Sequence, residues 1–130
     1  MNVLSGVMRF QAIVYAIYGL SYFFIPDFVI EDVLDWDTSS FWARGLGAVF
    51  IAVAWIEWNV VAKLEERRDL VWQFVLIPAL ILAGAVWEKG ADTYEGSDAY
   101  FAMVVAVTAF FTLLVGGAAW YANREVSAQV

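Results

Sequence analysis

The sequence predicts an all-α integral membrane protein, in which residues 1–130 form a single bundle of four transmembrane helices. The chain is 63% hydrophobic with a mean hydropathy of +0.71, far too apolar for an ordinary soluble domain. Four apolar segments of about 18 to 24 residues alternate with short polar intervals, and each can cross a hydrocarbon core of about 30 Å. Tryptophan and tyrosine gather at the expected ends of these segments, as they do at membrane interfaces.

The first apolar segment covers residues 6–25. Pro26 is expected to end it, because proline disfavours helical conformation in the residue before it. The acidic stretch that follows, 27–40, contains no lysine or arginine and supports two interpretations. Its apolar residues recur at roughly helical spacing, which is typical of a short amphipathic helix at the membrane surface. Its carboxylates fit a solvated loop equally well.

The second segment, 41–62, organises the rest of the chain. Three hydroxyl residues, 38–40, precede it and can cap the free amides at its start. Two ionisable residues, Arg44 and Glu57, lie within its apolar run. Each needs a partner, because an ionised side chain facing lipid costs at least about 2.5 kcal/mol. The other three segments are therefore expected to surround these charges.

The third segment covers residues 70–87 and the fourth covers residues 99–122. Pro78 lies within the third segment and has no N–H group, so it is expected to free one backbone carbonyl and to kink the helix. Small residues recur four apart in the second segment, at Ala43 and Gly47 and again at Ala48 and Ala52. This spacing predicts close helix packing, against the same chain or a neighbouring one.

The distribution of basic residues predicts the orientation of the bundle. Five of the seven fall on one side of the membrane, and only Arg44 and Lys89 fall on the other; the five are Arg9, Lys63, Arg67, Arg68 and Arg124. Because cytoplasmic loops are enriched in lysine and arginine, both termini are expected in the cytoplasm. The chain is thus expected to be a multi-pass protein of the cell membrane.

Polar residues near the cytoplasmic end of the bundle form the first candidate site. At about 1.5 Å per residue, Arg9, Glu57 and Gln73 fall in one layer, and Gln11 lies slightly deeper. We expect an ion pair between Arg9 and Glu57 with glutamine donors around it. Glu57 is the best functional candidate, because its short side chain cannot easily reach water from this depth.

A second cluster is expected at the outer end of the bundle, where Arg44 and Glu88 share a layer. Three further acids compete for Arg44: Asp27, Asp35 and Asp37. Ion pairs near helix ends commonly hold helices together, and a long arginine can also extend to the interface. A structural role is therefore the favoured interpretation for this cluster.

The composition excludes most enzyme classes. Cysteine and histidine are absent, which removes disulfides, thiolate nucleophiles, ordinary zinc sites and the commonest general base. No catalytic residue, metal site or cofactor is predicted, and the chain is not expected to be an enzyme. A net charge of −7 argues against a nucleic-acid partner.

Two stretches resemble the small four-helix membrane proteins of the DoxX-like group. Residues 18–26 read YGLSYFFIP, and residues 41–48 read FWARGLGA. That group commonly shows an aromatic first helix closed by proline and an Arg-x-x-Gly start to the second helix. The resemblance covers roughly the first half of the chain and implies that Arg44 and Gly47 are the shared positions. It also implies a link to subunits of quinone-linked sulfur oxidation, although many members have no assigned role.

Two functional hypotheses follow. The first is a non-catalytic accessory subunit or ligand-binding bundle that holds a lipid or quinone and associates with itself or with a larger membrane complex. Its pocket would lie near Glu57, Arg9 and Gln73, lined by aromatics such as Tyr15 and Trp55. The second is a small transporter or ion channel in which Glu57 titrates or binds a cation. The sequence patterns of small multidrug transporters and fluoride channels are both absent.

Overall fold

The computed structural model describes residues 2–33 and 38–130, and this part of the chain is helical with no strand. It contains four long helices: α1 (Asn2–Phe24), α2 (Ser40–Ala62), α3 (Val71–Gly90) and α4 (Asp98–Ala128). Each is long and apolar enough to cross a membrane. The predicted all-α class and the four apolar helices are therefore confirmed. Three bounds differ from expectation by more than one residue, because α1 begins four residues earlier, α3 ends three residues later and α4 ends six residues later.

The connection from α1 to α2 begins as a short helix. α1 ends two residues before Pro26, as the proline predicted. A π-helical stretch, η1 (Phe28–Val33), follows and buries Val29 and Ile30. The structure therefore shows a helix at the start of residues 27–40, as the first of the two interpretations predicted. Residues 34–37, which include the candidate partners of Arg44 at positions 35 and 37, lie outside the described residues.

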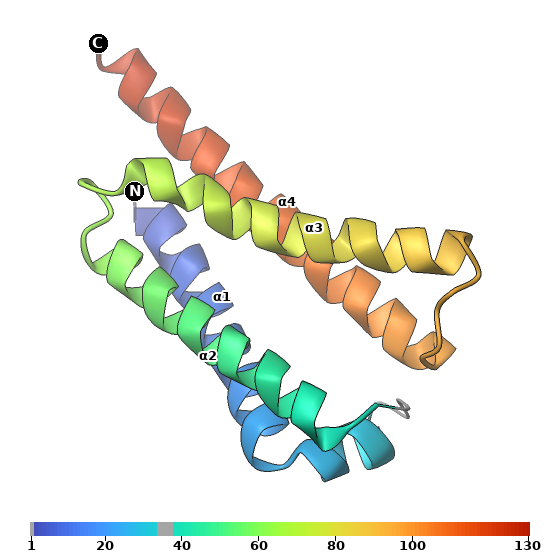
Figure 1. Cartoon of the computed structure of the whole chain (residues 1–130). Helices are drawn as coiled ribbons and strands as arrows, with labels where there is room; N and C mark the ends of the chain where they lie inside the picture. Colours follow the sequence, from blue (N-terminus) through green and yellow to red (C-terminus); the bar gives the residue numbers. More distant parts are fainter. Residues whose placement is uncertain (1, 34–37) are drawn as a thin grey trace.

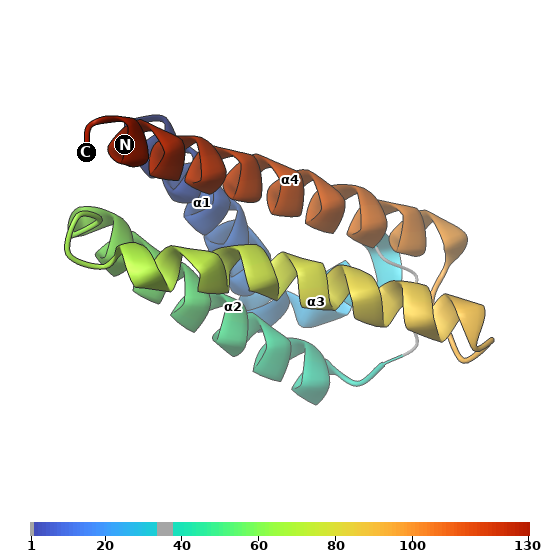
Figure 2. The ribbon, with the colours of Figure 1, turned by 90° about the horizontal axis from the view of Figure 1, so that it is seen from above.

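The four helices form two antiparallel hairpins. α1 packs along α2, α3 packs along α4, and the hairpins meet where α1 contacts α4 (Figure 1). α2 has little contact with α3 or α4, and the hairpins diverge away from the end that carries both termini (Figures 1 and 2). The short 3₁₀ helix η2 (Arg68–Leu70) lies between α2 and α3. The structure therefore has a closed end near the termini and a more open opposite end.

Glycine contacts bring α1 and α2 close together. A Cβ atom on Gly47 would lie 2.7 Å from the carbonyl oxygen of Gly19, so neither position has room for a side chain. Ala43, one turn earlier, is fully buried. The close approach predicted from Ala43 and Gly47 is therefore found within one chain. Ala48 and Ala52 are exposed and take no part in this contact.

The apolar core fills the closed end of the bundle. It draws on all four helices through residues such as Met8, Val60, Phe74 and Val115. Arg68, in the η2 segment, donates a hydrogen bond of 3.4 Å to the carbonyl of Ala122 in α4. This bond joins the connection between the two hairpins to the last helix.

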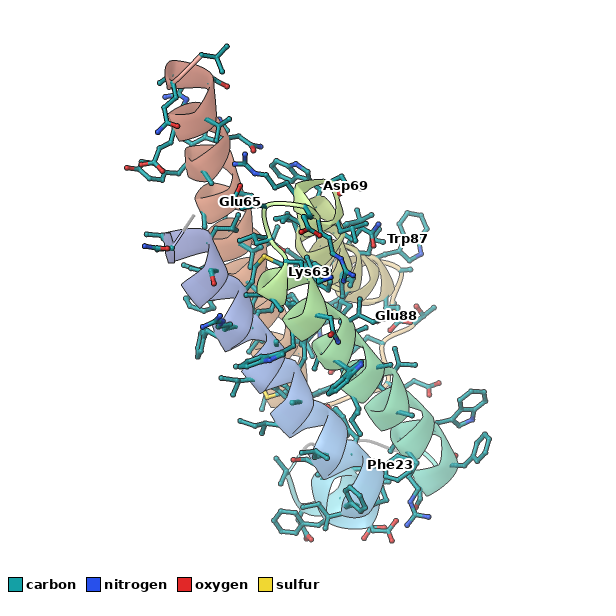
Figure 3. The ribbon with its side chains drawn as sticks, turned by 90° about the vertical axis from the view of Figure 1, so that its left-hand side faces the viewer. Phe23, Lys63, Glu65, Asp69, Trp87 and Glu88 are labelled. Atoms are coloured by element: carbon teal, nitrogen blue, oxygen red, sulfur yellow. The ribbon has the colours of Figure 1, made fainter. Side chains whose placement is uncertain are left out.

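Most charged residues lie near the ends of the helices or in the connections between them. Lys63, Glu65 and Asp69 lie around the α2–α3 connection, whereas Phe23 lies at the far end of the α1–α2 hairpin (Figure 3). Trp87 projects from the C-terminal half of α3 (Figure 3). This arrangement suits helices whose ends meet water and whose middles meet lipid.

Polar contacts hold the turn between α3 and α4. Lys89 Nζ lies 2.7 Å from Asp98 Oδ1, and Ser97 caps α4 by accepting a hydrogen bond from the Tyr100 amide at 3.1 Å. The Tyr94 hydroxyl donates to the Ser97 carbonyl at 2.8 Å. Partial burial raises the pKa of this tyrosine above its ordinary value.

Candidate functional site

A cavity of about 150 Å³ lies between the two hairpins, and we call it the tyrosine cavity. All four helices contribute to its wall, with Ile81 coming from α3. Its most distinctive lining residues are aromatic or sulfur-containing: Tyr15, Tyr18, Tyr22, Phe50, Tyr100 and Met103. The cavity therefore combines apolar walls with several phenolic hydroxyls.

The spacing of tyrosines along α1 builds one wall of this cavity. Tyr15, Tyr18 and Tyr22 are three and four residues apart, so their side chains share one face of the helix. Their ring centroids lie 5.5, 6.3 and 6.3 Å from that of Phe50 in α2. Such aromatic contacts stabilise the hairpin beyond the burial of area alone.

The α4 wall adds the thioether of Met103 to these aromatic rings. The Tyr18 hydroxyl donates to Met103 Sδ at 3.8 Å, which links α1 to α4 across the cavity. A hydrogen bond also joins the side chains of Tyr22 and Tyr100. The hydroxyl of Thr108 donates instead to the Val104 carbonyl of its own helix, at 2.6 Å. The polar character of the cavity therefore comes mainly from tyrosine.

A buried group of polar side chains adjoins the cavity, and we call Gln11, Tyr15 and Glu57 the inner polar cluster. Gln11 and Glu57 are fully buried, and Tyr15 is 5% exposed. Gln11 Nε2 donates to the Tyr15 hydroxyl at 3.1 Å and to the Phe74 carbonyl at 3.2 Å. That carbonyl has no intrahelical donor, because Pro78 four residues later lacks an N–H. The freed carbonyl predicted from the proline therefore receives its hydrogen bond from α1.

The antiparallel register places Glu57 beside Gln11. Gly19 faces Gly47, and Glu57 lies ten residues beyond Gly47 along α2. It is therefore level with residue 9 of α1, within about one helical turn of Gln11. Tyr15 is close enough to interact electrostatically with Glu57. Neither carboxylate oxygen of Glu57, nor Oε1 of Gln11, has a hydrogen-bond partner in the described part of the chain.

The expected ion pair between Arg9 and Glu57 is wrong. Arg9 is exposed, and its guanidinium lies 5.8 Å from the centre of the Trp58 ring. Gln73 is also exposed and does not join the cluster. The depth estimated along each helix placed these residues in the correct layer. It did not predict which side of the helix they face, because successive helical residues are rotated by about 100°, and Arg9 and Gln73 face outward.

The expected pair between Arg44 and Glu88 does not form either. Both side chains are exposed, and they belong to helices that diverge at this end of the bundle (Figure 1). Asp27, one of the competing acids, accepts a hydrogen bond from Ser40 instead. Within the described residues, the ion pair of this region joins Lys89 to Asp98, which lie at the two ends of the α3–α4 turn.

The pocket expected from the sequence is only partly found. Tyr15 lines the cavity as expected, whereas Trp55 is 71% exposed and lies on the outer face of α2. The contributions of Phe50, Tyr100 and Met103 were missed. The helical spacing of the tyrosines in α1 could have predicted one wall of the cavity. The single residues that the other helices contribute form no such pattern.

Among residues 2–33 and 38–130, no group of three or more His, Cys, Asp or Glu could hold a metal ion. No protein-family model, curated protein or solved structure matches the chain. The resemblance to the DoxX-like group therefore stays a prediction. Function has to be argued from the tyrosine cavity and the inner polar cluster.

Proposed function

We propose that this protein is a non-catalytic membrane bundle that binds a lipophilic molecule, a lipid or a quinone, in the tyrosine cavity. The observation that carries the proposal is the cavity itself, to which all four helices contribute aromatic or aliphatic walls. Ligand sites in membrane bundles are typically apolar cavities between helices with a few polar groups that fix orientation. The tyrosine hydroxyls supply those polar groups.

The size and chemistry of the cavity favour an uncharged ring. A dry cavity of about 150 Å³ can hold a molecule of the size of benzene. Among the described residues, none that lines the cavity is lysine or arginine, and these residues offer no counter-charge for an anionic headgroup. Phenolic hydroxyls can donate hydrogen bonds to carbonyl oxygens. A quinone ring fits this combination well, and a lipid chain is the alternative occupant.

The proposal includes an orientation and an assembly. Both termini lie at one end of the bundle (Figures 1 and 2), and the excess of basic residues supports placing that end in the cytoplasm. In each span, a third or less of the apolar window is buried inside the chain. The remaining surface is available to lipid and to other subunits, which is compatible with an accessory subunit in a homo-oligomer or a larger membrane complex.

A cavity-filling variant tests the proposal. The protein is extracted in mild detergent and analysed by native mass spectrometry for a co-purifying lipophile. Met103→Trp should fill the cavity and reduce the bound fraction. Leu113→Trp is the matched control, because it adds the same side chain to α4 at a position that is 76% exposed. The proposal would be contradicted if the wild type carried no bound lipophile, or if Met103→Trp carried as much as the wild type.

The alternative function is a small transporter or ion channel that uses Glu57. The observation in its favour is that this carboxyl group is fully buried with both oxygens unpartnered. Buried ionisable residues in membrane helices commonly mark ion or proton pathways. Flux of protons or cations in proteoliposomes that is abolished by Glu57→Gln would favour the alternative over ligand binding.

A further inference from the structure

The inner polar cluster contains more acceptors than donors. Gln11 uses both hydrogens of its amide on the oxygens of Tyr15 and Phe74. Three acceptor oxygens are left without a partner, two on Glu57 and one on Gln11. The cluster can supply one further donor, the Tyr15 hydroxyl hydrogen. One more hydrogen, carried by Glu57, would let all three oxygens take part in a hydrogen bond.

Among residues 2–33 and 38–130, no charged group compensates Glu57. On α1 the facing titratable group is Tyr15, and the guanidinium of Arg9 lies over Trp58 on the outer surface. The core positions of α3 and α4 near this level, Phe74 and Phe111 among them, are apolar. An ionised carboxylate buried here would have no counter-ion among the described residues, which is strongly unfavourable inside a bilayer.

We propose that Glu57 is a proton-binding site in which the neutral carboxylic acid completes a closed hydrogen-bonded ring. The acid donates its proton to Oε1 of Gln11, and its carbonyl oxygen accepts the hydroxyl hydrogen of Tyr15. Gln11 continues to donate to Tyr15 and to the carbonyl freed by Pro78. Rotation about the Glu57 side-chain torsions closes the ring, because Glu57 and Gln11 lie within about one helical turn.

A proton fits this site better than a metal cation. Hard divalent cations take six or more oxygen ligands, whereas the cluster leaves three oxygens unpartnered, two on Glu57 and one on Gln11. The oxygens of Tyr15 and Phe74 are already occupied by the Gln11 amide. One added proton and the Tyr15 hydroxyl hydrogen together give each of the three unpartnered oxygens a hydrogen bond. The proton needs no further ligand.

Infrared spectroscopy of the protein in lipid bilayers tests the ionisation state directly. At about pH 8 ordinary glutamates and aspartates are ionised, so a carboxylic C=O band at this pH belongs to a buried acid. We expect such a band in the wild type, with a shift in D₂O, and its loss in Glu57→Gln. Glu88→Gln is the control, because that side chain is exposed and its removal should leave the band unchanged.

Thermal stability provides an independent measurement. Glutamine keeps the donor and the carbonyl acceptor of the neutral acid and adds a second N–H, so Glu57→Gln should unfold close to the wild-type temperature, whereas Glu57→Leu should unfold at a lower one. A wild-type spectrum with no carboxylic band at about pH 8 would overturn the proposal even if both variants failed to fold. Loss of the band in NaCl or KCl, with a rise in unfolding temperature, would overturn it in favour of a metal cation. Persistence of the band in Glu57→Gln would also overturn it.

Discussion

Substituting Gly47 by alanine tests the close packing of α1 on α2. The added Cβ atom would lie 2.7 Å from the carbonyl oxygen of Gly19 and 2.7 Å from the amide nitrogen of Phe23. Both are backbone atoms, so neither can rotate away. Ordinary contact begins near 3.4 Å, so the two helices would have to separate by about 0.7 Å.

Gly45→Ala is the matched control for this prediction. It lies two residues away on the same helix, and a Cβ atom there meets nothing within 4 Å. Both variants gain the higher helix propensity of alanine, worth about 0.5 to 1 kcal/mol. The difference between them therefore measures the clash, which we expect to destabilise Gly47→Ala by about 1 to 3 kcal/mol relative to Gly45→Ala.

The measurement is unfolding in mixed micelles, followed by tryptophan fluorescence as the fraction of denaturing detergent rises. Gly47→Ala should unfold at a lower fraction than Gly45→Ala, and it should also lose ligand from the tyrosine cavity, because α1 carries three of its tyrosines. Equal midpoints for the two variants would show that the helices do not approach as closely as described, and the reasoning would fail.

Two further predictions concern one buried and one partly buried hydrogen bond. Gln11→Leu leaves the Phe74 carbonyl unpaired and should destabilise the protein by about 1 to 3 kcal/mol. Pro78→Ala restores an N–H for that carbonyl, so it should recover part of the loss in the double variant; equal losses with and without Pro78→Ala would contradict this account. Arg68→Met removes the bond to the Ala122 carbonyl and should lower stability by about 1 kcal/mol or less, as measured by the same unfolding titration.

The number and position of the helices could be predicted from the sequence, because membrane-spanning length and apolarity are properties of one contiguous segment. Pro26 predicted the end of α1 correctly for a local steric reason. The C-terminal end of α4 was not predicted, because hydropathy locates the apolar slab and not the end of the helix. Residues 123–128 are mostly polar but contain neither glycine nor proline, and the helix continues through them.

The site was harder to predict because membrane helices are apolar on every side. The buried stripe of α1 includes Met8, Gln11 and Tyr15, but the lipid-facing positions between them, such as Phe10 and Ile13, are equally hydrophobic. Periodicity therefore does not distinguish the inward face from the outward one. Depth along the helix predicted the layer of Glu57 and Gln11, and only the contacts between helices could show which neighbours share that layer.

The sparse contact between α2 and α3 determines how a guest molecule would reach the tyrosine cavity. Phe50 and Ile81, on these two diverging helices, both line it, so in a membrane-embedded bundle a guest would be expected to enter sideways from the acyl layer. The effective concentration of guest is then its concentration in the bilayer. Compounds with equal intrinsic fit would rank by their partition into lipid, and titrations should be expressed per mole of lipid.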